Sequence, residues 1–285
     1  MKRDLLPLSP AQWGEGPVWW KDRFYFVDIE GHCLRSYDPR SGEESVWPVD
    51  QRIGFALPCV SEKWIWGGDH GFYFLDLSTG HSTPITNPEA HLPDNRFNDA
   101  AVSPDGRLFA GSIALKKAKG TATLYRMDSR LKCEVAFPNV TNSNGLAWSP
   151  DGKTCYYIDT PSYQVRRFEY DPDNGELKNE QTAFRTDSLV SASPDGMCMD
   201  AEGNLWIAFC HGGCVIKFDP HTGKILQQID LPAVETTSCS FGGHELRDLY
   251  VTTGISSKHS EADAGKVFVI RNAAQGLPQT AFRDI

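Results

Sequence analysis

A hairpin signature that recurs along the chain limits the folds it can adopt. Three stretches align directly: NDAAVSPDGRLFAGS from Asn98, NGLAWSPDGKTCYYID from Asn144 and PDGMCMDAEGNLWIAF from Pro194. In each, a polar residue precedes a short apolar run, an acidic residue and a glycine form a turn, and a second apolar run follows. Asp-Gly and Glu-Gly pairs supply the positive φ that tight hairpins need. Each stretch is therefore predicted to form a β-hairpin.

Weaker copies extend the repeat to six: GEGPVWWKDRFYFVD from Gly14, GFALPCVSEKWIWGG from Gly54 and TTSCSFGGHELRDLYVTTG near Thr236. We call the residue that opens each hairpin its leader; the leaders fall near positions 15, 54, 98, 144, 195 and 237. The intervals of 39, 44, 46, 51 and 42 residues suit four-stranded propeller blades. The prediction is an all-β, six-bladed β-propeller with four antiparallel strands per blade, forming a single domain over residues 1–285. Two packed β-sandwiches would not repeat one signature six times.

Two further expectations concern the remaining segments. No stretch longer than one turn shows helical periodicity, so helix should contribute little. The N-terminal segment LLPLSP should pair into the last blade, which would close the ring and remove an open edge. The tryptophans fall mostly on predicted strands, and we expect them to pack between blades.

Composition excludes several classes of partner. The chain is 40% apolar and 11% aromatic, so 285 residues suffice for a large core. With 37 acidic and 28 basic residues, its net charge of -9 repels phosphate backbones, and no nucleic-acid partner is expected. No run of 18 apolar residues predicts a membrane span, and the first residues lack the apolar region of a signal peptide.

The eight cysteines are scattered, mostly inside apolar runs. This favours reduced, buried thiols in a cytoplasmic protein over a disulfide framework. Cys210 and Cys214 flank His211 in FCHGGC, which raises the question of zinc. No second pair stands at a suitable spacing, so the sequence favours buried thiols here as well.

Four of the six leaders are carboxylates or carboxamides: Glu15, Asn98, Asn144 and Asp195. Each alone could merely cap its own turn. In a propeller, however, the innermost strands all begin at one face beside the central channel, so the leaders should converge. The oxygens of Glu15, Asn144 and Asp195 would suit one divalent ion: Ca²⁺, Mg²⁺, Mn²⁺ or Zn²⁺. Three protein ligands leave positions open, as in a catalytic metal site.

The segments GEGPVW, RFNDAAVSPDGRLFAGS, NSNGLAWSPDGKTCYYIDT, SPDGMCMDAEGNLWIA and TSCSFGG together resemble the gluconolactonase/regucalcin (senescence marker protein) family. The resemblance runs from about Gly14 to Val269. It implies a six-bladed propeller with one divalent metal in the channel and lactonase activity on sugar lactones. By motif, it implies Glu15, Asn144 and Asp195 as metal ligands, with Asp195 also the general base.

The resemblance also implies that Arg96 and Asn98 bind substrate. Asp99, next to them, would either orient Arg96 or cap its strand. The chain departs from the family pattern after the third hairpin. Some animal members carry a glutamate pair there, whereas this chain reads IALKKAKG, with Lys116 in place of an acid. The sugar preference of those members therefore cannot be transferred.

The expected chemistry is hydrolysis of a cyclic ester. A divalent ion can polarise the carbonyl and lower the pKa of a water. Asp195 would accept the proton of that water, or only orient a hydroxide held by the ion. Arg96, Asn98 and Asp99 would hold the oxygens of the lactone.

We therefore expect a metal-dependent carboxylic-ester hydrolase that opens a sugar aldonolactone of the gluconolactone, arabinonolactone or xylonolactone type. Its partner would be this small molecule, and the protein a monomer or weak homo-oligomer. Two alternatives stay open at this point. One is a related propeller hydrolase acting on other lactones or phosphotriesters, and the other is a non-enzymatic calcium-binding propeller.

Overall fold

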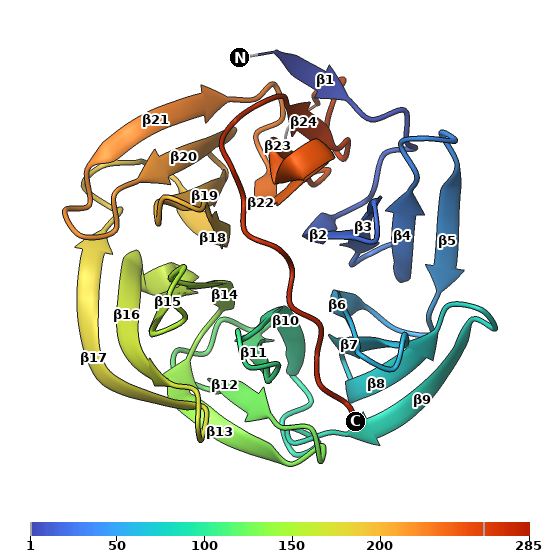
Figure 1. Cartoon of the computed structure of the whole chain (residues 1–285), viewed down its shortest axis with the longest axis vertical. Coiled ribbons are helices and arrows are strands. Elements are labelled where there is room, and N and C mark those ends of the chain that lie inside the picture. The colour runs from blue at the N-terminus through green and yellow to red at the C-terminus, as the bar shows by residue number, and fades with distance from the viewer. Residues whose placement is uncertain (1, 259) are drawn as a thin grey trace.

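Six four-stranded antiparallel sheets surround a central axis in the computed structural model, which describes residues 2–258 and 260–285 (Figure 1). We number the sheets as blades in chain order. Blade 1 contains β2 (Gly14–Trp20), β3 (Arg23–Asp28), β4 (Cys33–Tyr37) and β5 (Glu44–Pro48). Blade 2 contains β6 (Ile53–Pro58), β7 (Trp64–Gly68), β8 (Gly71–Asp76) and β9 (His81–Thr86). Blade 3 contains β10 (Asn95–Val102), β11 (Leu108–Ala114), β12 (Ala122–Met127) and β13 (Cys133–Val140).

The remaining blades repeat this order. Blade 4 contains β14 (Ser143–Trp148), β15 (Thr154–Asp159), β16 (Gln164–Asp171) and β17 (Glu176–Arg185). Blade 5 contains β18 (Ser193–Met199), β19 (Leu205–Cys210), β20 (Cys214–Phe218) and β21 (Ile225–Asp230). Blade 6 contains β22 (Thr236–Gly242), β23 (Asp248–Thr253), β24 (Phe268–Ile270) and, from the N-terminus, β1 (Arg3–Leu5). The predicted six-bladed propeller is confirmed.

The N-terminal strand closes the ring as expected, but it begins before LLPLSP and includes only the first residue of that segment, Leu5. Arg3–Leu5 pairs antiparallel with β24, so that Arg3 faces Ile270. Pro7 and Pro10 lack the N–H that a ladder position needs, which explains why the strand ends before them. The helical segments η1 (Thr160–Ser162) and η2 (His244–Leu246) have three residues each. No helix in the described part of the chain is long and apolar enough to cross a membrane.

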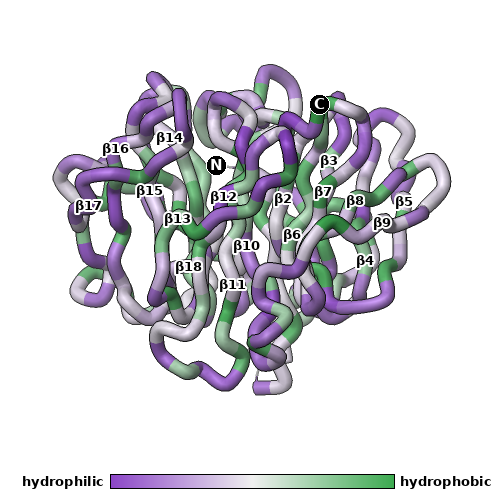
Figure 2. The backbone as a smooth tube through the Cα atoms, turned by 90° about the horizontal axis from the view of Figure 1, so that it is seen from below, coloured by the Kyte–Doolittle hydropathy of each residue, from purple (hydrophilic) through white to green (hydrophobic). Residues whose placement is uncertain are grey.

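The core lies between the blades. The inner strands of the blades are largely hydrophobic, whereas the connecting loops and outermost strands such as β17 are largely hydrophilic (Figure 2). Aromatic rings join neighbouring blades: Trp206 meets Phe241 edge-on with centroids 5.8 Å apart, and Phe109 meets Trp148 at 5.4 Å. Such pairs stabilise beyond the area they bury. These contacts confirm the expected packing of Trp148 and Trp206 between blades.

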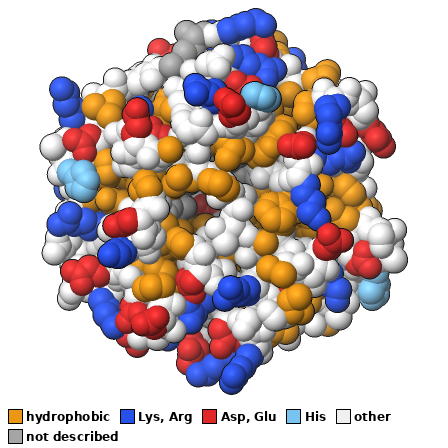
Figure 3. All heavy atoms as spheres, viewed as in Figure 1, with side chains coloured by type: hydrophobic (Ala, Val, Ile, Leu, Met, Phe, Trp, Pro, Cys, Tyr) orange, Lys and Arg blue, Asp and Glu red, His pale blue; other side chains and the backbone are white. Residues whose placement is uncertain are grey.

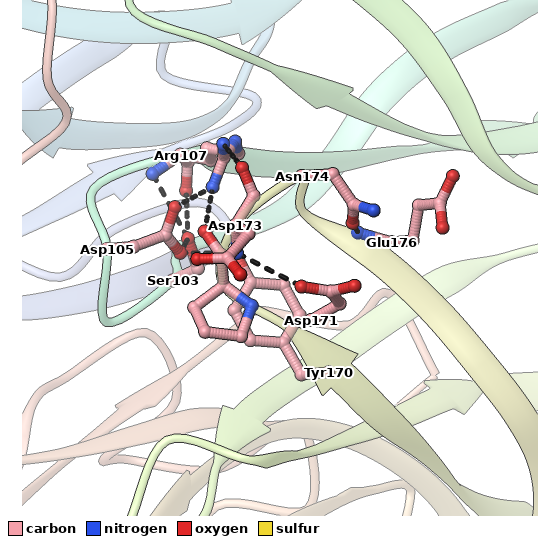
Figure 4. Close-up of polar contacts among 9 residues, drawn as sticks. Ser103, Asp105, Arg107, Tyr170, Asp171, Asp173, Asn174 and Glu176 are labelled. Carbon is pink, nitrogen blue, oxygen red and sulfur yellow. Dashed lines mark hydrogen bonds and ion pairs between the residues drawn. The ribbon is translucent and has the colours of Figure 1, made fainter.

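The polar turns of the repeat also link blades. In blade 3, the Ser103 hydroxyl donates to Asp105 Oδ1 at 2.8 Å, and Asp105 also accepts a hydrogen bond from Tyr170 of blade 4 (Figure 4). Arg107 Nη1 donates to the Pro172 carbonyl at 2.8 Å. The Ser-Pro-Asp-Gly turn therefore reverses the chain and also connects two blades, because Asp105 and the following Arg107 hydrogen-bond to blade 4.

Each innermost strand carries a β-bulge beside its leader. The register shifts lie between Glu15 and Val18, Ile53 and Phe55, Phe97 and Asp99, Asn144 and Leu146, Pro194 and Met197, and Thr236 and Ser238. A bulge re-aims a side chain and ends regular pairing. Six equivalent bulges thus set the leaders apart from the packed strands that follow them.

Glycine directly after a leader lets neighbouring innermost strands approach closely. A Cβ on Gly145 would lie 2.8 Å from the Asp195 carbonyl oxygen, and one on Gly196 would lie 2.0 Å from Ser238 Oγ. Real Cβ atoms do not reach such separations. The convergence of leaders from different blades therefore depends on these glycines.

The C-terminal segment crosses the end of the channel opposite the leaders (Figure 1). Gly276 forms an isolated antiparallel β-bridge with Asp200, which follows β18. Further along, the Phe282 N–H donates to the Pro58 carbonyl at 2.8 Å, and the Arg283 N–H donates to the Gly106 carbonyl at 2.9 Å. A cavity of about 310 Å³ lies in the channel, bounded on this side by Leu277, Pro278, Gln279 and Thr280. Hydrophobic side chains gather around the centre of this face (Figure 3).

Candidate active site and metal centre

The two acidic leaders are buried and close enough to repel each other. Glu15 on β2 is 6% exposed and Asp195 on β18 is 8% exposed. Burial raises the pKa of Glu15 well above its usual range, and the charges of Asp195 and Asp99 raise it further. Burial likewise raises the pKa of Asp195, and the charge of Asp99 adds to the effect. Buried neighbouring carboxyls of this kind either hold a proton or need a cation to compensate their charge.

The third predicted ligand, Asn144, is held in a chain of hydrogen bonds across three blades. Asn98 Nδ2 of blade 3 donates to Asn144 Oδ1 at 3.1 Å. Asn144 Nδ2 donates to Thr160 Oγ1 at 2.8 Å, and the Thr160 hydroxyl donates to the Pro194 carbonyl at 2.9 Å. Pro194 directly precedes Asp195, so Thr160 connects the backbone beside one predicted ligand to the side chain of another. No sequence motif predicts this role of Thr160.

Arg96 is a buried cation with unused hydrogen-bonding capacity. Its Nη1 donates to the Phe97 carbonyl at 2.9 Å and to Asn98 Oδ1 at 2.8 Å. Its Nε is buried and has no partner within the described structure. Burial and the nearby Arg52 charge lower the pKa of Arg96 to about 10, so the guanidinium stays charged at neutral pH. A charged group with a free donor suits an oxygen-rich ligand.

Asp99 faces the channel below the leaders. Its Oδ1 accepts a hydrogen bond from the Ala100 N–H at 2.7 Å, and it borders the channel cavity. Burial raises the pKa of Asp99 to about 6. The guanidinium of Arg96 donates to Asn98 and to the Phe97 carbonyl, and the described residues show no hydrogen bond between Arg96 and Asp99.

Lys116 lies at the rim and is neutralised by a neighbouring acid. Its Nζ is 2.8 Å from Asp94 Oδ2, and both side chains are more than half exposed. The Leu115 N–H donates to the Asp94 carbonyl at 2.9 Å. The loop that carries Lys116 is thereby joined to the residues that lead into Arg96.

The donor set of Glu15, Asn144 and Asp195 fits a divalent cation. All three offer oxygen atoms, which hard cations prefer. Among residues 2–258 and 260–285, Asn98 is the one donor to Asn144 Oδ1, so a second lone pair stays available. The two carboxylates are buried together and repel each other, and a cation between them would relieve that repulsion.

Comparison with known families agrees with this geometry. Residues 13–255 match the model of the SMP-30/Gluconolactonase/LRE-like region, and the match includes all six leaders. The chain belongs to the SMP-30/gluconolactonase family.

Individual members of the family are similar to the chain over almost its whole length. Regucalcin of Xenopus laevis is 35% identical over 94% of each chain. A protein of Bacillus subtilis (strain 168) named putative sugar lactone lactonase YvrE is 33% identical, again over 94% of each chain. Among solved structures, a luciferin-regenerating enzyme superposes with a TM-score of 0.93 at 27% identity and 99% coverage of both chains.

This SMP-30/gluconolactonase member also contains a group of ligating side chains that the sequence did not reveal. Among the described residues, Cys210, His211 and Glu235 form the one set of three His, Cys, Asp or Glu side chains whose ligand atoms all lie within 4.8 Å of one another. Cys214 is not part of it, although FCHGGC had drawn attention to that pair. Glu235 comes from the next blade, and no spacing rule connects it to residues 210 and 211.

The cysteines are free, as expected, and six of the eight are buried. Burial, together with the nearby charges of Asp195 and Glu235, raises the pKa of the Cys210 thiol. This thiol is therefore protonated at neutral pH when no cation is near it.

Proposed function

We propose that the protein is a metal-dependent lactonase that hydrolyses sugar aldonolactones to aldonic acids. Membership of the SMP-30/gluconolactonase family supports this, as does the name of the Bacillus relative. The observation that carries the proposal is the burial of Glu15 and Asp195 together, beside an Asn144 amide that neighbouring blades hold in place.

In this proposal, Glu15, Asn144 and Asp195 hold one divalent ion. Such an ion, when bound, polarises the carbonyl oxygen of the lactone and makes a water easier to deprotonate. Glu15 and Asp195 supply the balancing negative charge. Asn98 and Thr160 fix the orientation of the Asn144 amide. The amide therefore does not lose conformational entropy when substrate binds.

Arg96 and Asn98 position the substrate. The charged guanidinium of Arg96 has an unpartnered Nε for the hydroxyl or ring oxygens of a sugar lactone. Asn98 Nδ2 already donates to the Ser143 carbonyl and to Asn144. Its Oδ1 accepts a bond from Arg96 alone within the described part of the chain, and it can accept a sugar hydroxyl as well. We place substrate entry at the leader face, where Arg96 and Asn98 open their strand, because the C-terminal segment crosses the far end of the channel.

Asp195 acts as the proton carrier. Its carboxylate takes a proton from the attacking water as the new C–O bond forms at the carbonyl carbon. When the ring C–O bond breaks, the same proton passes to the departing ring oxygen, which becomes a hydroxyl. The pKa of Asp195 is raised in the cation-free site, and a bound cation would lower it again and keep the carboxylate ionised, as a proton acceptor must be.

A pH-indicator assay over a panel of five- and six-membered lactones tests this function. We expect hydrolysis that stops with chelator and returns with a divalent cation. Asp195→Ala should lower the rate by about 10²–10⁴-fold, whereas Asp187→Ala, at an exposed carboxylate in the preceding loop, serves as the matched control.

Each part of the proposal can fail separately in that assay. A parent rate in Asp195→Ala would refute the role of Asp195. Activity that chelation leaves unchanged would refute the metal requirement. Inactivity across the whole panel would refute the lactonase and support a non-enzymatic cation-binding propeller.

A further inference from the structure

A second group of ligating side chains lies next to the leaders. Cys210 ends β19, His211 begins the turn to β20, and Glu235 directly precedes β22. His211 Nδ1 is 2.6 Å from Glu235 Oε2, and Cys210 Sγ is 3.2 Å from the same oxygen. The Cys210 sulfur and His211 Nδ1 are 4.0 Å apart. Three different ligand atoms therefore meet at one point.

The backbone explains how two consecutive residues reach the same point. Side chains of neighbouring residues in a strand point to opposite faces. His211 instead has a φ of 66°, in the left-handed region, which turns its ring to the side of the Cys210 sulfur. A backbone bridge between Cys210 and Glu235 brings the carboxylate from blade 6 to the same side.

The cluster adjoins the leader site, because the Cys210 thiol lies within hydrogen-bonding reach of the Asp195 carboxyl. Cys210 pairs with Ser193, two residues before Asp195. Cys210 and Glu235 are buried, at 6% and 2% exposure, whereas the His211 side chain is 59% exposed. The cluster thus has a closed side formed by sulfur and carboxylate and an open side at the histidine.

Sulfur, imidazole nitrogen and carboxylate oxygen are the ligand types of protein zinc sites. A tetrahedral zinc ion with ordinary bond lengths needs donor atoms about 3.3–3.6 Å apart. The three observed separations differ from this by less than about 1 Å each, a shift that side-chain rotation can supply. The leader site offers only oxygen, so the two sites prefer different cations.

We propose that Cys210, His211 and Glu235 form a zinc site distinct from the cation site proposed at the leaders. Zinc binding forms a bond to the Cys210 sulfur and releases the thiol proton to solvent. Coordination through His211 Nδ1 requires that this nitrogen carry no proton, so the bound ring is the neutral tautomer with its proton on Nε2. With three protein ligands, the fourth position faces the exposed side and takes a water or an oxygen ligand. This site goes beyond the proposed lactonase activity and does not depend on it.

Cobalt substitution of the full-length protein tests the site. After chelator treatment, titration with Co²⁺ should produce a thiolate-to-cobalt charge-transfer band that saturates at one equivalent for this site. Cys210→Ser should abolish the band, whereas Cys214→Ser, three residues beyond His211 and outside the cluster, should retain it. Glu15→Gln should also retain it, because the leader site is separate.

Zinc affinity, measured by competition with a chromophoric chelator, gives a second readout. Loss of even an outer-shell partner typically weakens metal binding about 10–100-fold, so His211→Asn should weaken it at least about tenfold. Asparagine tolerates positive φ, and the side chain is exposed, so this variant stays informative if Cys210→Ser does not fold.

Several results would overturn the zinc site. These are no charge-transfer band in the parent protein, a band that survives Cys210→Ser, or a band that Cys214→Ser abolishes equally. Unchanged zinc affinity in His211→Asn would overturn it as well. Loss of the band in Glu15→Gln would show a single shared ion and would refute the separation of the two sites.

Discussion

Thr160 should control the affinity of the leader site without binding the ion itself, because it hydrogen-bonds the proposed ligand Asn144. Its Oγ1 accepts from Asn144 Nδ2 at 2.8 Å, and its hydroxyl donates to the Pro194 carbonyl at 2.9 Å. Thr160→Val keeps the shape of the side chain and removes both bonds. The Asn144 amide, in a residue that is 3% exposed, then loses the partner that orients its oxygen.

The size of the loss in stability and cation affinity follows from the hydrogen bonds that the Asn144 amide and the Pro194 carbonyl lose. A buried polar group without a partner costs about 1–3 kcal/mol, so the free energy of unfolding should fall by roughly that amount. Cation affinity should fall about 10–100-fold, as for other partners that orient a ligand without binding the metal. That range corresponds to about 1.4–2.7 kcal/mol of binding free energy.

Isothermal titration with calcium or manganese measures the affinity, and lactone hydrolysis at saturating cation measures the rate. Thr160→Ser keeps the hydroxyl and should restore parent affinity even where its stability is lower. The reasoning is wrong if Thr160→Val binds the cation as tightly as the parent. It is also wrong if Thr160→Ser is impaired to the same degree, because the effect would then come from packing.

Three further changes have predictable outcomes. Gly145→Ala places a Cβ 2.8 Å from the Asp195 carbonyl oxygen, so urea unfolding should show a loss of about 1–3 kcal/mol, and an unchanged midpoint would argue against close strand approach. Phe282 is fully buried in the C-terminal segment, and Phe282→Ala should lower the free energy of unfolding by about 3–5 kcal/mol; a loss below about 1 kcal/mol would mean that this segment is not firmly docked. In cation-free protein, burial raises the pKa of Asp99 from its ordinary 3.8 to about 6, so stability is fully present below about pH 4 and declines as pH rises through 6, by about 3 kcal/mol from this group. Glu15 and Asp195 act in the same direction; calorimetry with chelator at about pH 5 and about pH 7 should therefore show the lower melting temperature at the higher pH, and the reverse order would contradict this.

The fold could be predicted because its determinants are local and repeated. A hairpin needs only alternating apolar runs and a turn with positive φ, and the Asp-Gly and Glu-Gly pairs mark that turn in three blades. The six innermost strands begin at or within a few residues of the expected leaders. Propeller geometry then brings equivalent positions to one end of the channel. This is why the sequence alone could group Glu15, Asn144 and Asp195 into one predicted site.

The parts that could not be predicted depend on contacts between blades. Thr160 acts through a carbonyl in the next blade, and Glu235 reaches Cys210 from a different sheet. Neither contact has a fixed sequence spacing. The left-handed backbone at His211 could not be predicted either. A non-glycine residue seldom takes this conformation, and position 211 itself is not a glycine. The crossing of the C-terminal segment over the channel likewise depends on tertiary docking, as at Phe282.

The most direct test of the central claim, a cation site where the leaders converge, is an anomalous-difference map from crystals soaked in manganese. We predict the strongest peak between the side-chain oxygens of Glu15, Asn144 and Asp195, at distances suited to direct coordination. Absence of a peak there, or a peak found solely at the Cys210, His211 and Glu235 cluster, would contradict the claim.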